Sequence, residues 1–204
     1  VYGSGRSEEI VGKAMAEYGN REKIVLATKV GLDWTSGKVY RNSTRDRIMK
    51  EVEDSLVRLR TDYIDIYQIH WPDYDTPIEE TAKAMNELFE KGIIKAIGVS
   101  NYSTEQMDVF RKNAPLHTSQ PPYNLFERGI DDGIFPYCDD NGITMLLYGA
   151  ICRGLLSGRM NKDTKFEGDD IRKADPKFRE PRFEQYLRAV SLLDEYAQKH
   201  FGKR

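Results

Sequence analysis

Three side chains that can move or polarise a proton stand beside short apolar runs or a glycine turn. Tyr2 opens the turn YGSG, Lys29 follows the run IVLAT, and His70 follows the run IDIYQI. A free tyrosine has a pKa of about 10 and is a poor acid at neutral pH. A neighbouring lysine cation would stabilise the phenolate and lower that pKa, while a histidine can orient a carbonyl oxygen. The trio therefore suits donation of a proton to a developing alkoxide.

Such a reaction also needs a hydride, and no side chain supplies one, so a nicotinamide cofactor is implied. Taken singly, each residue has an ordinary explanation. A lysine after a strand is usually solvated, a lone histidine at a strand end is usually structural, and Tyr2 could simply pack against a helix. The three gain weight because they recur at matching places, and because Lys29 interrupts an apolar context where an unpaired ammonium is costly.

The elements that must position these residues alternate between strands and helices. Apolar runs typical of strands buried on both faces cover 24–28, 64–69, 93–99 and 143–148, with a weaker run at 116–120. Between them lie amphipathic helices, for which Ser43, the capping box at 76–79 and the capping box at 103–106 are predicted starts. This order predicts βα units, in a doubly wound open sheet or in a (β/α)8 barrel. A barrel takes about 250 residues, so a barrel here would lack strands at one or both ends.

Further polar side chains lie at the ends of the later predicted strands. Ser100 and Asn101 follow the run at 93–99, Gln120 ends the run at 116–120, and Tyr148 ends the run at 143–148. Because the carboxyl ends of parallel strands meet on one face, we expect these residues to join Lys29 in one site.

Length and composition describe a globular protein of one domain or two small ones, and we expect a single domain over 1–204. The net charge is −2 with acidic and basic residues interleaved, so nothing favours nucleic acid or an anionic membrane. Two distant cysteines argue against a disulfide framework and for a reducing, cytoplasmic location, and no apolar run or signal peptide indicates a membrane or export. The three histidines lack ligand spacing, so no metal site is expected. The start inside a motif, without Met, leads us to expect a truncated chain.

Several segments in order resemble the aldo-keto reductase family: YGSGRSEE, ATKVG, LRTDYIDIYQIHWPD, KAIGVSNYS, QPPYNL and LLYGAICRGLLSG. The chain is most similar to the bacterial branch that also resembles the β-subunits of voltage-gated potassium channels. The resemblance implies an α/β fold, the (β/α)8 TIM barrel of that family, with only its central strands and helices present. It also implies NADPH as cofactor, and the choice of NADPH over NADH rests on the resemblance alone.

The resemblance assigns a role to each candidate residue. Tyr2, Lys29 and His70 match the catalytic residues, and the family's catalytic Asp would precede Val1. Ser100, Asn101 and Gln120 match the carboxamide site, and Tyr148 matches the ring that stacks on the nicotinamide. The loop that passes the pyrophosphate would include Gly149, Ala150, Arg153, Gly154, Leu156 and Gly158. The polar segment 161–181 would fold over the cofactor, and Trp34, Tyr40 and Trp71 would line the substrate pocket.

We therefore expect an NADPH-dependent oxidoreductase that reduces an aldehyde or ketone, a small-molecule carbonyl substrate, to an alcohol. The alternative is a redox-sensing protein of the same fold with little turnover. A short-chain dehydrogenase is disfavoured because no Tyr precedes a Lys by four residues, and GSG at 3–5 lacks the third glycine of a phosphate loop. A metal hydrolase is disfavoured because the three histidines lack ligand spacing. A Schiff-base aldolase using Lys29 would leave the polar residues at the later strand ends without a role. The physiological substrate is not identified, and a homo-oligomer is left open.

Overall fold

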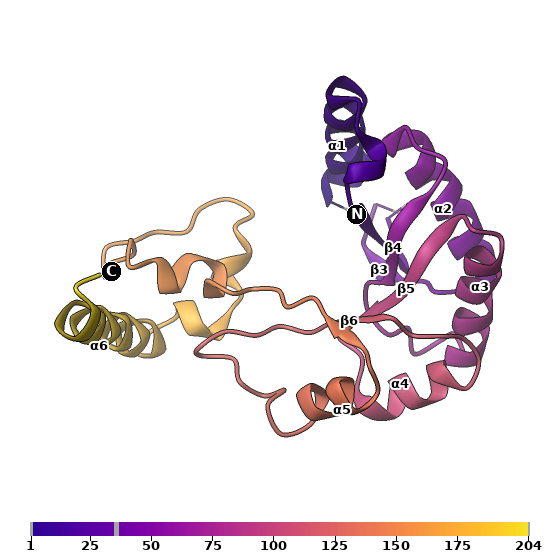
Figure 1. Cartoon of the computed structure of the whole chain (residues 1–204). Helices are drawn as coiled ribbons and strands as arrows, with labels where there is room; N and C mark the ends of the chain where they lie inside the picture. The colour runs from indigo at the N-terminus through magenta and orange to yellow at the C-terminus, as the bar shows by residue number, and fades with distance from the viewer. Residues whose placement is uncertain (1, 35–36, 204) are drawn as a thin grey trace. The chain divides into compact units, whose positions relative to one another are not determined.

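The computed structural model describes residues 2–34 and 37–203 (Figure 1). The α-helices are α1 (Arg6–Tyr18), α2 (Arg45–Leu59), α3 (Ile78–Glu90), α4 (Thr104–Arg111), α5 (Ile134–Asp140) and α6 (Arg182–Phe201). The strands are β1 (Ala27–Val30), β2 (Leu32–Asp33), β3 (Tyr40–Arg41), β4 (Ile64–Ile69), β5 (Ile94–Ser100), β6 (Thr118–Gln120) and β7 (Thr144–Met145). Short 3₁₀ helices are η1 (Tyr2–Gly5), η2 (Arg21–Lys23), η3 (Cys152–Ser157), η4 (Ile171–Lys173) and η5 (Pro176–Phe178).

Five strands form one parallel sheet in the order β1-β4-β5-β6-β7, which confirms the predicted alternation of strands and helices. Among the described residues, the sheet ends at β1 on one side and at β7 on the other, so it is a partial barrel and not a closed one. The sequence did not indicate β2 and β3, which form a small antiparallel hairpin directly after β1.

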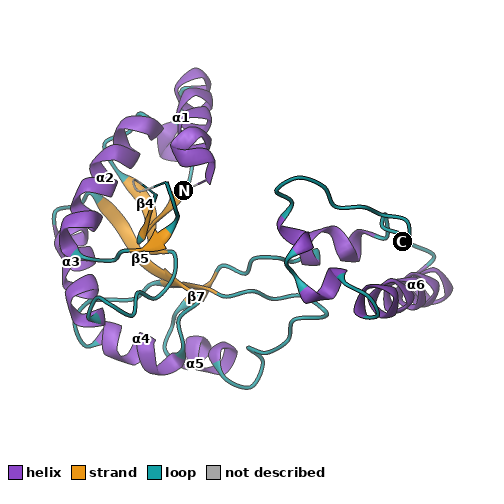
Figure 2. Cartoon of the chain, turned by 180° about the vertical axis from the view of Figure 1, so that it is seen from behind, coloured by secondary structure: helices purple, strands orange, loops and turns teal. Residues whose placement is uncertain are grey.

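Helices α2, α3 and α4 pack on one face of this five-stranded sheet, and Figure 2 shows them curving around the strands. The helix-facing side chains of neighbouring strands, such as Val30, Ile69 and Val99, are almost fully buried. Burying such a side chain contributes about 1.5–3 kcal/mol, which is why apolar residues dominate these runs. On the other face burial is incomplete, since Ile66 of β4 and Ala96 of β5 are only partly buried.

Several predicted boundaries were wrong in detail. The strand predicted at 24–28 is β1, which begins three residues later. At Leu26 only the carbonyl pairs with the main chain beside β4, because its N–H donates to the Asp65 carboxylate. The strand predicted at 143–148 pairs with β6 only at 144–145. Helix α2 is capped by Thr44 and not by Ser43.

The two capping boxes had different outcomes. The box at 103–106 is confirmed, with Ser103 and Gln106 exchanging side-chain and main-chain hydrogen bonds. The prediction of a capping box at 76–79 is wrong. Its Thr76 hydroxyl donates instead to Asp73 at 2.7 Å, and Pro77 precedes the first turn of α3 without a side-chain cap.

The chain separates into two compact units by its internal contacts. The first contains the residues up to Pro121 together with Gly129–Leu147, and the second contains Pro122–Arg128 together with the residues from Tyr148 onward. The predicted polar loop at 161–181 belongs to the second unit and is partly ordered, because Phe166 and Phe178 pack with Phe183 in its core. That the chain forms a single barrel domain stays a prediction.

None of the helices in the described ranges is both long and apolar enough to cross a membrane.

Candidate active site

The structure brings together the three residues that the sequence singled out for proton chemistry. The phenol oxygen of Tyr2 lies 3.3 Å from Nε2 of His70, and their ring centroids are 5.6 Å apart. The ammonium of Lys29 lies 5.5 Å from the centroid of the Tyr2 ring. A phenol between a cation and an imidazole is the arrangement expected for a tyrosine that donates a proton.

Local structure explains how residues so far apart in sequence meet. Lys29 lies within β1, not just past it as predicted, and pairs in register with Gln68 of β4. His70 follows β4 directly, and its N–H donates to the carbonyl of Val30 at 2.8 Å. Tyr2 begins η1, where Gly5 has a φ of 95° that favours glycine and lets α1 start at once. The end of β1, the end of β4 and the start of α1 therefore converge.

Burial controls the protonation of these groups. Burial, followed by the positive charge of Lys29, lowers the pKa of His70 to about 4, so the imidazole is neutral at neutral pH. Burial also lowers the pKa of Lys29 and raises the pKa of Tyr2. The direction for Tyr2 is opposite to the one predicted from the sequence, because loss of hydration disfavours the phenolate. The Tyr2 side chain thus holds its proton firmly in this structure.

A cavity of about 250 Å³ opens beside these residues. Its lining includes Tyr2, Lys29 and His70 together with residues of α1, β1 and the end of α2. On its wall the Thr28 hydroxyl donates to Glu8 at 2.6 Å, and Glu8 in turn accepts from Arg58 at 2.6 Å. The sequence analysis missed Glu8 and Thr28, because their partnership joins a helix and a strand by tertiary packing alone.

The residues predicted to hold the carboxamide lie at the ends of β5 and β6. The Ser100 hydroxyl donates to the carbonyl of Gln120 at 2.7 Å. The Asn101 amide donates to the Ser100 oxygen at 3.0 Å and to the carbonyl of His70 at 3.1 Å. Ser100, Asn101 and Gln120 are therefore neighbours, and Asn101 is directly bonded to the backbone of the catalytic candidate His70.

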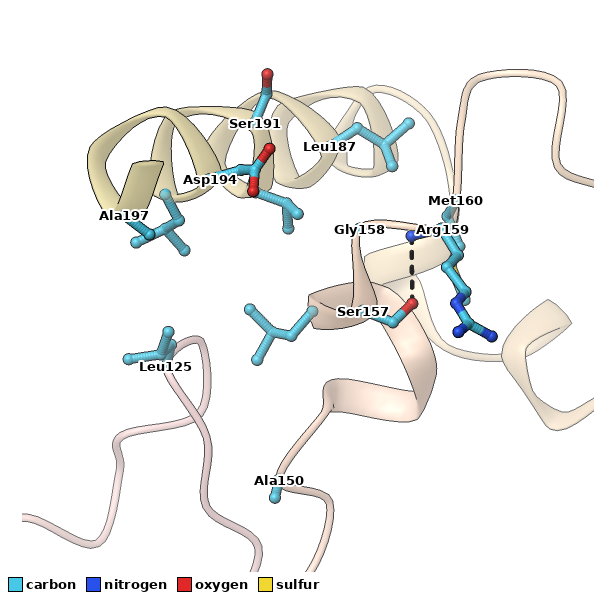
Figure 3. Close-up of a pocket in the computed structure, with 13 residues that line it drawn as sticks. Leu125, Ala150, Ser157, Gly158, Arg159, Met160, Leu187, Ser191, Asp194 and Ala197 are labelled. Carbon is cyan, nitrogen blue, oxygen red and sulfur yellow. Dashed lines mark hydrogen bonds between the residues drawn. The ribbon is translucent and has the colours of Figure 1, made fainter. Parts of the chain in front are cut away.

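In the second unit, the predicted cofactor loop follows Tyr148 (Figure 3). The carbonyl of Tyr148 accepts from the N–H of Tyr123 at 3.0 Å, and its ring is 39% exposed. Ala150, Leu156 and Gly158 line a cavity of about 780 Å³, with the loop on one side and Asp194 and Ala197 of α6 on the other.

The remaining loop residues have structural partners. Arg153 forms an ion pair with Asp175 at 3.0 Å. Gly154 has a φ of 92°, and a side chain there would also press on Met160, so this position requires glycine. Gly149 also takes a positive φ, of 76°. Cys152 and Arg153 of the same loop also have positive φ values, of 48° and 54°, so glycines account for only part of its conformation.

Two of the three aromatic residues predicted to line the substrate pocket lie beside an arginine. Trp34 follows β2, with the Arg47 guanidinium 5.2 Å from its ring. Trp71 directly follows His70 and has the Arg41 guanidinium 5.3 Å from its ring. Tyr40 belongs to β3 and is 44% exposed. Their role in substrate binding stays a prediction.

The donor types fit a nicotinamide cofactor better than a metal. Two amide side chains, Asn101 and Gln120, can both donate to and accept from a carboxamide, which itself has both functions. Across the described ranges 2–34 and 37–203, no group of three or more His, Cys, Asp or Glu side chains could hold a metal ion.

Comparison with known proteins agrees with this geometry. The model of the aldo/keto reductase family matches residues 1–203. Aldo-keto reductase YhdN of Bacillus subtilis (strain 168) is 60% identical over 203 residues, which are 100% of this chain and 61% of that protein. A probable voltage-gated potassium channel subunit beta of Arabidopsis thaliana is 36% identical, over 79% of this chain and 52% of that protein.

Solved structures that match the chain point to the same family. The glycerol dehydrogenase AKR11B4 of Gluconobacter oxydans superposes with a TM-score of 0.91 at 53% identity, covering 98% of this chain and 62% of that one. An aldo/keto reductase of Klebsiella pneumoniae in complex with NADP and acetate has a TM-score of 0.65 at 34% identity, covering 79% and 53%. The chain thus spans about three fifths of the length of its relatives. With its Tyr, Lys and His in this arrangement, the chain belongs to the aldo/keto reductase family.

Proposed function

We propose that the protein is an NADPH-dependent reductase that converts an aldehyde or ketone to an alcohol. The observation that carries the proposal is the convergence of Tyr2, Lys29 and His70, with the Tyr2 hydroxyl 3.3 Å from His70. The reaction adds a hydride and a proton across a carbonyl, and the bound nicotinamide supplies the hydride. Every other step falls to the side chains of this chain.

Tyr2 is the proton donor in this proposal. Its phenol proton goes to the carbonyl oxygen as negative charge develops there, and the positive charge of Lys29 stabilises the phenolate left behind. His70 stays neutral, since burial and Lys29 lower its pKa to about 4, and it orients the carbonyl oxygen by hydrogen bonding. A neutral imidazole neither repels the Lys29 ammonium nor competes with Tyr2 as the acid.

We assign the cofactor to the residues whose types fit it. Asn101 and Gln120, with Ser100, hold the carboxamide, and the Tyr148 ring stacks on the nicotinamide. The loop from Gly149 to Gly158 passes the pyrophosphate, and the cavity of about 780 Å³ beside it has room for part of a dinucleotide. The NADP in the Klebsiella pneumoniae relative supports this choice of cofactor. Segment 161–181 covers the cofactor in this proposal.

Two buried thiols, Cys138 and Cys152, support a reducing compartment, and we place the protein in the cytoplasm.

The test is NADPH oxidation, followed by the loss of its absorbance, with a reactive aromatic aldehyde and the chain as it stands. We expect turnover that falls at least about 10²-fold in Tyr2→Phe, the size usual for loss of a general acid. Turnover that is equal in both proteins would remove Tyr2 from the mechanism. Tight NADPH binding without turnover would favour the alternative, a redox-sensing protein of the same fold.

A further inference from the structure

Asn124 and its neighbour Tyr123 bind the main-chain carbonyls of Gly149 and Tyr148, respectively. The side chain of Asn124 is buried, with only 6% of the residue exposed. Its amide donates to the carbonyl of Gly149 at 3.0 Å and to the carboxylate of Glu127. Its oxygen accepts from the N–H of Phe126 at 2.9 Å, which holds the turn in place. The neighbouring Tyr123 N–H donates to the carbonyl of Tyr148 at 3.0 Å.

Glu127 continues this chain of contacts into segment 161–181. Its second oxygen accepts from the Lys177 ammonium at 2.8 Å. Burial alone would raise the pKa of Glu127, but the hydrogen bonds from Lys177 and Asn124 outweigh it and hold that pKa below its ordinary value. The carboxylate is therefore charged at neutral pH, and Lys177 is its counterion.

Lys177 also connects this set of contacts to the cofactor loop at 149–158, through Asp175. Its ammonium lies 3.2 Å from the carboxylate of Asp175, which is 8% exposed. Asp175 in turn pairs with Arg153 at 3.0 Å. A continuous set of contacts thus joins Gly149 to Arg153 of the same loop. It runs through residues 124–127 and then through residues 175–177.

We propose that Glu127 and Lys177 are positioning residues for the cofactor, acting through Asn124 on the main chain of Tyr148 and Gly149. The inference rests on the proposed function, because it takes the Tyr148 ring as the surface on which the nicotinamide stacks. The Lys177 ammonium binds the carboxylates of Glu127 and Asp175, and it acts on the loop through them. The affinity for NADPH depends on it, because it neutralises the carboxylate that orients Asn124.

The physical reason is the cost of leaving one partner behind. Removing Lys177 leaves the half-buried Glu127 carboxylate with the Asn124 amide as its remaining strong partner. The carboxylate then turns toward water, Asn124 loses its fixed orientation, and the Gly149 carbonyl is released. The Tyr148 ring then loses its fixed position, and NADPH affinity falls with the loss of preorganisation.

The experiment compares Lys177→Met with Lys91→Met in the same chain. Lys91 is a matched control, since it also pairs with a glutamate, Glu87, at 2.7 Å and lies outside the cofactor site. Two quantities are measured: the NADPH dissociation constant by fluorescence titration, and hydrogen exchange of the Tyr123 and Phe126 amides. We expect Lys177→Met to weaken NADPH about 10-fold and to speed both exchange rates. Lys91→Met changes neither, and Lys177→Arg restores most of the affinity.

Glu127→Gln separates positioning from simple attraction between charges. It removes a negative charge, so long-range electrostatics alone would tighten the binding of the anionic NADPH. Positioning predicts the opposite, a several-fold weaker affinity with faster exchange. Tighter binding in Glu127→Gln would overturn the proposal.

The remaining outcomes are also decisive. Faster exchange in Lys177→Met with unchanged NADPH affinity would show a purely structural ion pair and overturn the positioning role while leaving the proposed function intact. No NADPH binding by the unsubstituted chain would overturn the proposed function and, with it, this inference.

Discussion

The phenol oxygen of Tyr2 and Nε2 of His70 lie 3.3 Å apart, although 68 residues separate them in the chain. The contact is possible because β1 and β4 are adjacent and parallel, so His70 emerges beside the end of β1. Lys29 lies on the same side, with its ammonium 5.5 Å from the Tyr2 ring. In this geometry the positive charge of Lys29 lowers the pKa of His70, in addition to the effect of burial.

Replacing Lys29 by Met should raise the pKa of His70. The positive charge of Lys29 is the second cause, after burial, that lowers this pKa to about 4. Removing the charge leaves burial in place, so the pKa should rise but stay below the ordinary value of about 6.5. The measurement is an NMR titration of the His70 ring protons. Lys23→Met, a change of the same type in η2, serves as the control. An unshifted His70 midpoint in Lys29→Met would contradict the coupling.

His70 should also make stability depend on pH. Its pKa is about 4 in the folded chain, against about 6.5 when unfolded. Between these values the unfolded chain binds a proton that the folded chain does not, so the free energy of unfolding falls as pH falls from about 6.5 to about 4. Above pH 6.5 this group has no effect. Urea unfolding of the wild type and of His70→Gln at pH 7.5 and 4.5 measures the difference. Equal pH dependence in the two proteins would refute this contribution.

Tyr148→Ala should weaken cofactor binding more than it affects folding. Stacking of a base on an aromatic side chain contributes about 1–3 kcal/mol, so the NADPH dissociation constant should rise at least about 5-fold. The Tyr148 carbonyl keeps its bond from Tyr123, because the substitution changes only the side chain. Fluorescence titration measures the affinity, with Tyr148→Phe as the matched control that keeps the ring. Normal affinity in Tyr148→Ala would show that the ring does not stack on the nicotinamide.

Much of the first unit could be predicted from the sequence, because apolar runs and capping residues act locally. The run IDIYQI predicts β4 to the residue, and the Ser103 capping box predicts the start of α4. Tertiary contacts decide the rest. The Leu26 N–H donates to the Asp65 carboxylate, and Lys177 meets Glu127 only because two segments 50 residues apart pack together. No local pattern marks either partnership.

Gly12→Ala should destabilise the chain even though alanine favours helices. In a helix interior this change ordinarily stabilises by about 1 kcal/mol. Here a Cβ on Gly12 would come within 2.4 Å of the Arg58 carbonyl and 2.7 Å of the Leu59 backbone, because α1 packs closely on α2. Backbone cannot yield as a side chain can, so we expect a net loss of about 1–3 kcal/mol in urea unfolding. Gly129→Ala, where nothing lies within 4 Å, should change stability by less than about 0.5 kcal/mol. A stabilised Gly12→Ala would mean that α1 does not contact α2 as described.

Glu51→Gln should cost more stability than Asp54→Asn on the same helix. Glu51 is 4% exposed and binds both Arg47 and Arg58, which are themselves held by Asp33 at 3.3 Å and by Glu8 at 2.6 Å. Removing the shared carboxylate leaves two poorly hydrated cations with one strong anionic partner each.

Loss of one partner from a buried pair costs about 3–5 kcal/mol, and the outer carboxylates should reduce that to about 2 kcal/mol here. Asp54 pairs with Lys50 at 3.0 Å on the exposed face of α2, where such pairs contribute at most about 1 kcal/mol.

The two variants differ in burial while the chemical change is the same, so the ratio of their effects in urea unfolding measures what burial adds. Added salt should reduce the small effect of Asp54→Asn and leave the Glu51→Gln effect nearly unchanged, because buried pairs are screened far less. Equal losses in the two variants, or equal salt sensitivity, would show that the Glu8–Arg58–Glu51–Arg47–Asp33 network is open to water.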